Sequence, residues 1–271
     1  IAAYGECPFK GPITHSFVND AQGYKMSKSL GNTVDPEEII KESGAEILRL
    51  WVSHEDYGQD LKISKEAVTR ITDSYRRFRN TFRFMLGNLY DFTPGKDSVP
   101  YATLTPLDKW ALSQLNELIQ KCETAYNAFE YYKVYHAVNR FFTVDLSATY
   151  LDVLKDRLYT SRVDGVGRRA AQTVIHETVL ALCSILTPIS TFLAEEAYGY
   201  LPSKTQESVL LTSFPAARTE WTNSEIEKDF ARLLQVREIA SKELEERRKN
   251  KEIGASLEAK LMIAAPREDL K

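Results

Sequence analysis

The clearest pattern of apolar positions lies between residues 65 and 90. Apolar side chains recur there at alternating intervals of four and three residues, and this spacing places them on one side of a helix. On a helical wheel with about 100° per residue, these positions stay within about 40° of the first one. The pattern therefore predicts one long helix over residues 65–90 with a single buried face. The positions on that face are Ile71, Tyr75, Phe78, Phe82, Met85 and Leu89.

Helix start signals precede several other apolar runs. Asp35 followed by Pro36 and two glutamates is typical of an N-cap, a first-turn proline and acids near the positive end of the helix dipole. Gly44 marks the end of this helix, and Thr105-Pro106 marks the start of another that includes Cys122. Similar patterns predict further helices at residues 45–52, 129–154, 168–186, 189–201 and 224–251. Long helices joined by short loops predict an antiparallel bundle.

The two ends of the chain have a different pattern. The short apolar stretch Ile13 to Val18 lies among glycines and prolines, and it predicts a strand that leads into a loop. A second strand is predicted at residues 257–263. We therefore expect a mainly α fold, an antiparallel helical bundle preceded by a small α/β segment.

Composition narrows the class of protein. The 271 residues are 43% hydrophobic and 27% charged, which is ordinary for a globular protein, and the net charge is −3. A chain with this charge is not a basic nucleic-acid binder as a whole, so any anion site must be a local patch. The longest uncharged run, residues 178–194, contains Pro188 and is short for a membrane span, so we expect a buried helix there and no membrane partner.

The cysteines and the first residue add two expectations. Cys7, Cys122 and Cys183 are far apart, and no Cys-x-x-Cys pair occurs. This spacing predicts neither a zinc site nor a disulfide framework, and it fits a reducing, cytoplasmic setting. The sequence starts at Ile1 rather than at methionine, and we expect it to be part of a longer protein.

The stretch GYKMSKSLGN, residues 23–32, is the first candidate for chemistry. Lys25 and Lys28 are three residues apart, with Ser27 and Ser29 beside them. An ammonium group is a compact charge on a flexible stem, and a loop that carries two of them can close over a polyphosphate after it binds. From the residues alone, a solvated charged turn remains an alternative.

A row of arginines on the helix at 65–90 is the second candidate. Arg79, Arg83 and Arg76 lie at about 80°, 120° and 140° from Ile71 on the helical wheel, beside the predicted buried face. Six basic and two acidic residues give residues 65–90 a local charge of +4 in an acidic protein. Such a row can follow a phosphate backbone, and the alternative is a solvated face or salt bridges. Arg77 lies at about 240°, which predicts a structural role or a different contact.

A third group lies on either side of the glycine-containing turn at residues 164–167. Helix ends and loops at one pole of a bundle are suited to reading unpaired RNA bases by stacking and by hydrogen bonds to base edges. The alternative is ion pairing with Asp152, Asp156 and Asp164. The candidate residues of this group are Lys155, Arg157, Tyr159, Arg168 and Arg169.

Lys25-Met26-Ser27-Lys28-Ser29 is also the signature pentapeptide of the class I aminoacyl-tRNA synthetases, and we name it the KMSKS loop (residues 25–29). Nearly end to end, the chain resembles the bacterial isoleucyl members of that family, from this loop through the anticodon-binding domain near their C-terminus. The family usually has glycine where Ser16 follows Thr14-His15, and a basic residue in place of Tyr24. The similar stretches are residues 30–32, 35–36, 44–52, 73–84, 150–159 and 256–259.

The resemblance implies ligation of isoleucine to tRNA(Ile) through an aminoacyl-adenylate made from ATP with Mg²⁺. Lys28 would stabilise the charge on the leaving pyrophosphate and Lys25 would assist, which is worth about 3–4 kcal/mol or about 10²–10³ in rate. The implied ATP-binding residues are Lys25, Met26, Ser27, Lys28 and Ser29. The resemblance implies tRNA contacts by Arg76, Arg79 and Arg83. From their position at one pole of the bundle we add Lys155, Arg157, Tyr159, Arg168 and Arg169 as tRNA-binding candidates.

The resemblance also predicts a division of the chain. We expect the end of a catalytic nucleotide-binding domain at 1–32, a helical connector at 33–63, an anticodon-binding bundle at 64–215, and a C-terminal helix with the start of a small α/β subdomain at 216–271. We expect a monomer without a metal site.

The family's second ATP motif, of the type His-x-Gly-His, fits none of the four histidines (His15, His54, His136 and His176), so we expect no aminoacylation by this chain alone. Two alternatives stay open: a non-catalytic helical scaffold that binds an acidic protein, and a standalone tRNA-binding module.

Overall fold

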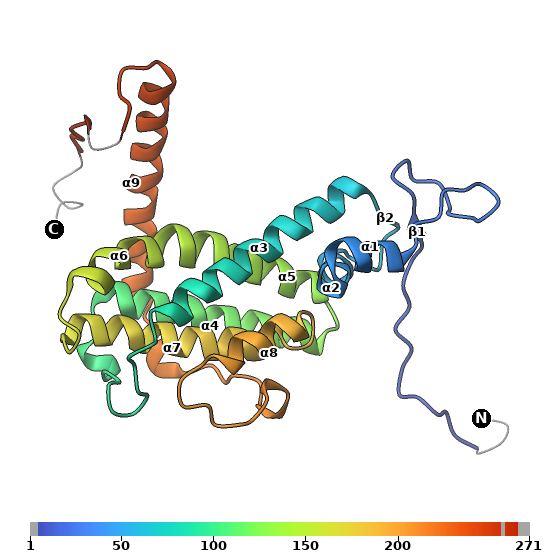
Figure 1. Cartoon of the computed structure of the whole chain (residues 1–271), viewed down its shortest axis with the longest axis horizontal. Helices are drawn as coiled ribbons and strands as arrows, with labels where there is room; N and C mark the ends of the chain where they lie inside the picture. Colours follow the sequence, from blue (N-terminus) through green and yellow to red (C-terminus); the bar gives the residue numbers. More distant parts are fainter. Residues whose placement is uncertain (1–4, 256–257, 265–271) are drawn as a thin grey trace. The chain divides into compact units, whose positions relative to one another are not determined.

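The computed structural model describes residues 5–255 and 258–264 of the chain. Contacts divide it into two compact units, Ile1–Thr222 and Asn223–Lys271. Figure 1 shows the first unit from blue to orange and the second in red. No helix in the described ranges is long and apolar enough to cross a membrane.

The first unit begins with a small α/β segment. Strands β1 (Val18–Asn19) and β2 (Leu61–Lys62) pair in parallel, and helices α1 (Pro36–Ser43) and α2 (Ala45–His54) lie between them in the chain. The strand predicted at residues 13–18 is wrong for most of its length, because only Val18 and Asn19 meet a partner strand. Phe17 remains 67% exposed and takes no part in the sheet's core.

The boundaries of α1 follow from its capping residues. The carboxylate of Asp35 accepts a hydrogen bond from the backbone of Glu37, and Pro36 occupies the first turn. Gly44 ends the helix with φ of 91°, a conformation that favours glycine. The predicted helix start and stop are confirmed.

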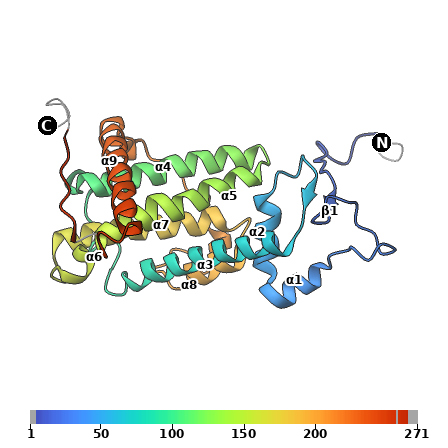
Figure 2. The ribbon, with the colours of Figure 1, turned by 90° about the horizontal axis from the view of Figure 1, so that it is seen from above.

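After β2, the described residues of the first unit form six α-helices and one π-helical segment, joined by loops and short 3₁₀ turns. Figures 1 and 2 show α3, α4, α5 and α7 side by side, and contacts join α4 to both α5 and α7. The predicted fold class, a mainly α bundle with a small α/β segment, is confirmed. The elements are α3 (Lys65–Gly87), α4 (Pro106–Asn127), α5 (Tyr131–Arg140), the π-helical η2 (Phe141–Tyr150), α6 (Leu151–Thr160), α7 (Val166–Leu186) and α8 (Thr191–Gly199), with short 3₁₀ turns at Tyr101–Thr103, Val209–Leu211 and Thr219–Trp221.

The apolar stripe of α3 forms part of the bundle's core. Ile71, Phe78 and Met85 are at most 3% exposed. The helix ends at Gly87, three residues before the predicted end, because the Asn88 side chain donates to the backbone oxygen of Phe84 and closes the last turn.

The single helix predicted at residues 129–154 is instead three consecutive segments, α5, η2 and α6, which extend to Thr160. In η2, Thr149 donates its hydroxyl to the backbone oxygen of Val144, five residues earlier. The apolar run through this segment leaves Phe141, Phe142 and Leu146 all buried, so the spacing gave no sign of the wider turn.

The second unit contains α9 (Ser224–Lys249), which Asn223 caps by accepting from the backbone of Ile226. Of the strand predicted at 257–263, residue 257 lies outside the described residues, and residues 258–263 form no strand. Their apolar side chains, such as Met262 at 85%, are exposed, since no described strand offers a partner.

Candidate functional site

Two polar side chains hold the backbone around the KMSKS loop. The Asp20 carboxylate accepts hydrogen bonds from the backbone nitrogens of Gln22 (3.1 Å) and Tyr24 (2.8 Å) and from the Asn32 amide (2.9 Å). The Asn32 oxygen accepts from the backbone nitrogen of Ser27 at 2.9 Å. The loop is therefore fixed from both sides without using its lysines.

The hydrogen bond from Asn32, followed by that from the backbone of Tyr24, lowers the pKa of the Asp20 carboxyl below its ordinary value. Asp20 is thus a carboxylate at neutral pH, the form in which it accepts all of these bonds. Sequence reasoning missed both Asp20 and Asn32, although an aspartate three residues before Gly23 is a recognisable turn signal.

The side chains of the loop point in different directions. Met26 is half-buried and packs against a hydrophobic cluster that includes Ile39, Trp51 and Tyr135. Lys25 and Lys28 are exposed, and their ammonium groups form no ion pair or hydrogen bond within the described residues. The loop therefore presents two uncompensated ammonium groups on a backbone anchored by Met26.

Serine hydroxyl groups form further hydrogen bonds within the KMSKS loop and near it. The hydroxyls of Ser27 and Ser29 are 3.1 Å apart and hydrogen-bonded, and Ser27 also accepts from the backbone of Leu30 at 3.3 Å. Before the loop, Ser16 donates its hydroxyl to Asp60, which also accepts from the backbone of Phe17. The serine at position 16 thus ties residues before β1 to those before β2.

The arginine row on α3 is only partly free. Arg76 is 3.4 Å from the carboxylate of Asp73, and its side chain is 70% exposed. Arg79 donates two hydrogen bonds, of 2.5 and 2.7 Å, to Glu196 on α8. Arg83 is exposed and has no ion pair in the described part of the chain.

The third group of candidates separates by burial. Lys155 pairs with Asp152 at 2.9 Å, as the ion-pair alternative predicted, and both side chains are more than half exposed. Tyr159 is 65% exposed. Arg157, by contrast, donates to both oxygens of Asp108, at 2.9 and 2.7 Å, and the Asp108 side chain has no exposed surface.

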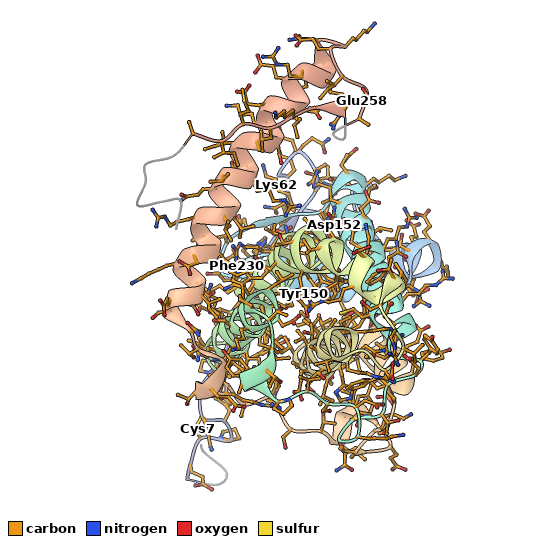
Figure 3. The ribbon with its side chains drawn as sticks, turned by 90° about the vertical axis from the view of Figure 1, so that its left-hand side faces the viewer. Cys7, Lys62, Tyr150, Asp152, Phe230 and Glu258 are labelled. Atoms are coloured by element: carbon orange, nitrogen blue, oxygen red, sulfur yellow. The ribbon has the colours of Figure 1, made fainter. Side chains whose placement is uncertain are left out.

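Tyr150 shares the Asp108 carboxylate by donating its hydroxyl at 2.7 Å. Figure 3 shows Tyr150 among the helices of the bundle, while Asp152 lies at the surface. The guanidinium group of Arg157 is therefore held by a buried carboxylate on α4, which Tyr150 of η2 also binds.

Arg168 and Arg169 both bind Asp91. Arg168 donates to the two carboxylate oxygens at 2.6 and 3.0 Å, and Arg169 donates to the backbone oxygen at 2.7 Å. The hydrogen bond from Arg168 contributes to a pKa of Asp91 below the ordinary value, although burial opposes it. The ion-pair partners predicted for Arg157, Arg168 and Arg169 were wrong, because folding brings Asp91 and Asp108 to them from distant positions.

A cavity of about 580 Å³ opens beside these residues, between the end of α3 and the start of α7. Tyr90 and Tyr159, 78% and 65% exposed, lie along its lining. The guanidinium group of Arg168 lies 5.9 Å from the centroid of Tyr90, and Phe84 meets Tyr159 edge to face. The exposed rings can stack on a planar base, and the nearby guanidinium group of Arg83 can bind the phosphate of the same nucleotide.

The described residues also bear on metal binding and thiol reactivity, and two of the three cysteines, Cys122 and Cys183, are buried. Within the described residues, no group of three or more histidine, cysteine, aspartate or glutamate side chains could hold a metal ion. Burial raises the pKa of the Cys122 thiol to about 12 and that of Cys183 further still, so neither forms a thiolate near neutral pH.

Comparison with known protein families shows the family to which the chain belongs. A model of the anticodon-binding domain of tRNA ligase matches residues 108–263, more than half of the chain. The chain belongs to this tRNA ligase family. A model of class I tRNA synthetases (I, L, M and V) also matches residues 1–64, which include the KMSKS loop.

Among curated tRNA ligases, the chain is similar to isoleucine–tRNA ligases over almost all of its length. It is 48% identical to that of Geobacter sulfurreducens over 98% of this chain, and 46% identical to that of Persephonella marina over 99%. The chain spans 29% of the length of each of these relatives.

Solved tRNA synthetases share the fold. A leucyl enzyme of Agrobacterium radiobacter, solved in a ternary complex with tRNA and LeuAMS, gives a TM-score of 0.58 at 18% identity, covering 77% of this chain and 24% of its own. Mycobacterium tuberculosis methionyl-tRNA synthetase gives 0.59 at 21% identity, with 77% and 43% covered. These identities support the fold of the tRNA ligase bundle and no more.

Proposed function

We propose that the chain is a segment of an isoleucine–tRNA ligase, in which it supplies the pyrophosphate-stabilising loop and the anticodon-binding bundle. The whole enzyme would activate isoleucine with ATP and transfer it to tRNA(Ile). The observation that carries the proposal is the KMSKS loop: Asp20 and Asn32 fix its backbone, and Lys25 and Lys28 remain without acidic partners. The similarity to isoleucine–tRNA ligases supports isoleucine as the amino acid substrate.

In this proposal the two ammonium groups bind the β and γ phosphates of ATP. Negative charge moves onto these phosphates as pyrophosphate leaves, and a fixed cation aimed at that charge stabilises the transition state more than the substrate. Ser27 and Ser29 donate to phosphate oxygens or keep the loop in shape, and Met26 holds it on the helices. Mg²⁺ arrives with ATP, since the loop's exposed side chains suit phosphate rather than a metal ion.

For tRNA, we propose that the exposed cations Arg76, Arg83 and Lys155 contact backbone phosphates. Arg79 joins them when it exchanges Glu196 for RNA. Tyr159 stacks an unpaired base in the cavity beside Arg83. We assign Arg157, Arg168 and Arg169 to positioning: their bonds to Asp108 and Asp91 fix the pole of the bundle on which Tyr159 lies. By itself the chain activates no amino acid, because it has no His-x-Gly-His sequence.

The test is Lys28→Ala in the full-length enzyme. We expect isoleucine-dependent pyrophosphate exchange to fall about 10²–10³-fold, with a much smaller change in isoleucine affinity, since the ammonium acts in the transition state. Lys41→Ala is the matched control, because Lys41 is an exposed lysine on α1 that pairs only with Glu37. Equal exchange rates in the Lys28 and Lys41 variants would refute the assignment of the loop.

A further inference from the structure

A second cavity, separate from the sites above, lies where α2, α3 and α5 meet. Its volume is about 440 Å³, and contacts join α2 to both α3 and α5 around it. Figure 2 shows the three helices together at one end of the bundle. Four of its lining residues are basic: Arg70 and Arg77 from α3, His54 from α2 and His136 from α5.

The two arginines have no acidic partner. In the described ranges the Arg70 side chain forms no ion pair or hydrogen bond, although its charge contributes to the lowered pKa of exposed Glu66, and the Arg77 side chain donates to the hydroxyl of Ser74 at 2.9 Å. The acids that line the cavity are already engaged. Glu55 is 3.0 Å from His54, and Asp73 interacts with Arg76 on the other flank of α3. Two guanidinium groups therefore face the cavity region with no carboxylate bound to them.

A histidine pair also lines the cavity, and one of the two responds to the charge around it. The rings of His54 and His136 lie 4.9 Å apart. Burial, and then the neighbouring His54, lower the pKa of His136 below its ordinary value. A bound anion would oppose both effects and favour the imidazolium form.

The cavity also has unsatisfied polar groups in its wall. The indole nitrogen of Trp51 and the amide oxygen of Asn139 are buried and lack a hydrogen-bond partner in the described part of the molecule. Trp51 is only 4% exposed. A buried N–H group without a partner is costly, so a small side-chain shift that brought the Trp51 donor to an acceptor in the cavity would be favourable. The Asn139 oxygen is itself an acceptor and adds nothing to anion binding.

We propose that this cavity binds a phosphate group, carried either by an RNA backbone or by a free phosphate compound. Planar guanidinium groups match phosphate oxygens in geometry and charge, and Arg70 and Arg77 lie seven residues apart on the same face of α3. With this site, α3 carries arginines for anions on both flanks of its buried face. The site does not depend on the proposed function of the KMSKS loop, and the test below does not involve that loop.

The test follows the histidines by NMR in the 271-residue chain with isotope-labelled histidine. We expect inorganic phosphate to shift the His54 and His136 signals saturably and to raise the pKa of His136, while the signals of His15 and half-buried His176 stay unchanged. Arg70→Gln combined with Arg77→Gln should weaken phosphate binding about tenfold or more. Trp51→Phe, which keeps a ring but removes the donor, should weaken it less. Lys121→Gln, on α4 and paired with Glu117, is the control for loss of charge.

Addition of tRNA then shows whether the bound phosphate group comes from an RNA backbone or from a free phosphate compound. If tRNA produces the same shifts and competes with phosphate, the ligand is the RNA backbone. If tRNA binds and leaves these histidines unaffected, the ligand is a free phosphate compound. The proposal fails if phosphate causes no saturable shift, or if the shift persists in the folded Arg70 and Arg77 double variant.

Discussion

Asp108 shows how one side chain can serve several elements at once. It completes the capping box of α4 with Thr105, accepts the hydroxyl of Tyr150, and binds both guanidinium nitrogens of Arg157. No part of its side chain is exposed. A buried charge with this many donors is stable only while all of them remain.

Asp108→Ala should therefore lower the free energy of unfolding by about 3–5 kcal/mol, because it leaves the Arg157 charge buried and unpaired. Urea denaturation of the variant chain would measure this. Arg157→Ala should have a similar effect, and the double variant should lose less than the sum. If Arg157→Ala left stability unchanged and only weakened tRNA binding, Arg157 would be a direct RNA contact instead.

Asp145 is also buried, but unlike Asp108 it has too few hydrogen-bond donors around it to stabilise its charged form. It is 6% exposed on η2, and burial raises its pKa to about 6, only partly offset by Arg140. Because the folded pKa lies above the unfolded one, the folded state binds the proton more tightly. Stability therefore decreases as pH rises from about 4 to about 6 and stays lower above that range.

Asp145→Asn should remove this pH dependence and raise the free energy of unfolding by about 1–3 kcal/mol near neutral pH. Urea denaturation at several pH values would measure both effects. The parent chain and the variant should converge near about pH 4. A variant less stable than its parent at neutral pH would mean that the ion pair with Arg140 outweighs the cost of burial.

At the scale of elements, the pair Arg79–Glu196 joins α3 to α8 across the bundle surface. Both side chains are nearly half exposed, so the pair contributes about 0–1 kcal/mol to stability. In the proposed tRNA contact, the pair would affect RNA affinity more than stability. Glu196 occupies the guanidinium group of Arg79, which a phosphate would otherwise bind.

Glu196→Gln should therefore strengthen tRNA binding about two- to tenfold while changing stability by less than about 1 kcal/mol. Filter binding at low salt and urea denaturation would measure the two effects. Glu177→Gln is a suitable control, since Glu177 pairs with Arg218 in a similar surface bridge. Unchanged tRNA affinity in the Glu196 variant would remove Arg79 from the proposed contacts.

The elements that the sequence predicted well are those with local signals. Asp35, Pro36 and Gly44 define α1 without help from the rest of the chain, and the stripe of α3 follows from spacing alone. The π-helical segment and the two-residue strands were not predictable in this way. The first has no distinctive spacing, and the strands exist only because β1 and β2, far apart in sequence, meet.

In the candidate site, too, residues in local motifs could be predicted from the sequence, and their partners from distant positions could not. Lys25 and Lys28 were evident from a ten-residue stretch, but Asp20 and Asn32, which hold their loop, became evident only from hydrogen bonds. At the pole, residue type and position indicated the candidates. The division into exposed Lys155 and Tyr159 and paired arginines depends on Asp91 and Asp108, which no local pattern connects to them.

For the molecule as a whole, a net charge of −3 means that RNA binding must come from local cations acting against general repulsion. We expect tRNA affinity to fall steeply with salt concentration. Arg83→Ala should reduce the slope of log affinity against log salt by about 1, as expected for one lost phosphate contact. Binding measured at several salt concentrations would give the slope, and a slope equal to that of the parent would exclude this contact.

The half-buried Met26 limits how the KMSKS loop can move. Its side chain lies in the same hydrophobic cluster as Trp51 and Tyr135, so pulling the loop outward would expose part of a group whose full burial is worth about 1.5–3 kcal/mol. With the backbone held in this way, the long side chains of Lys25 and Lys28, rather than the loop as a whole, would reach toward a bound phosphate.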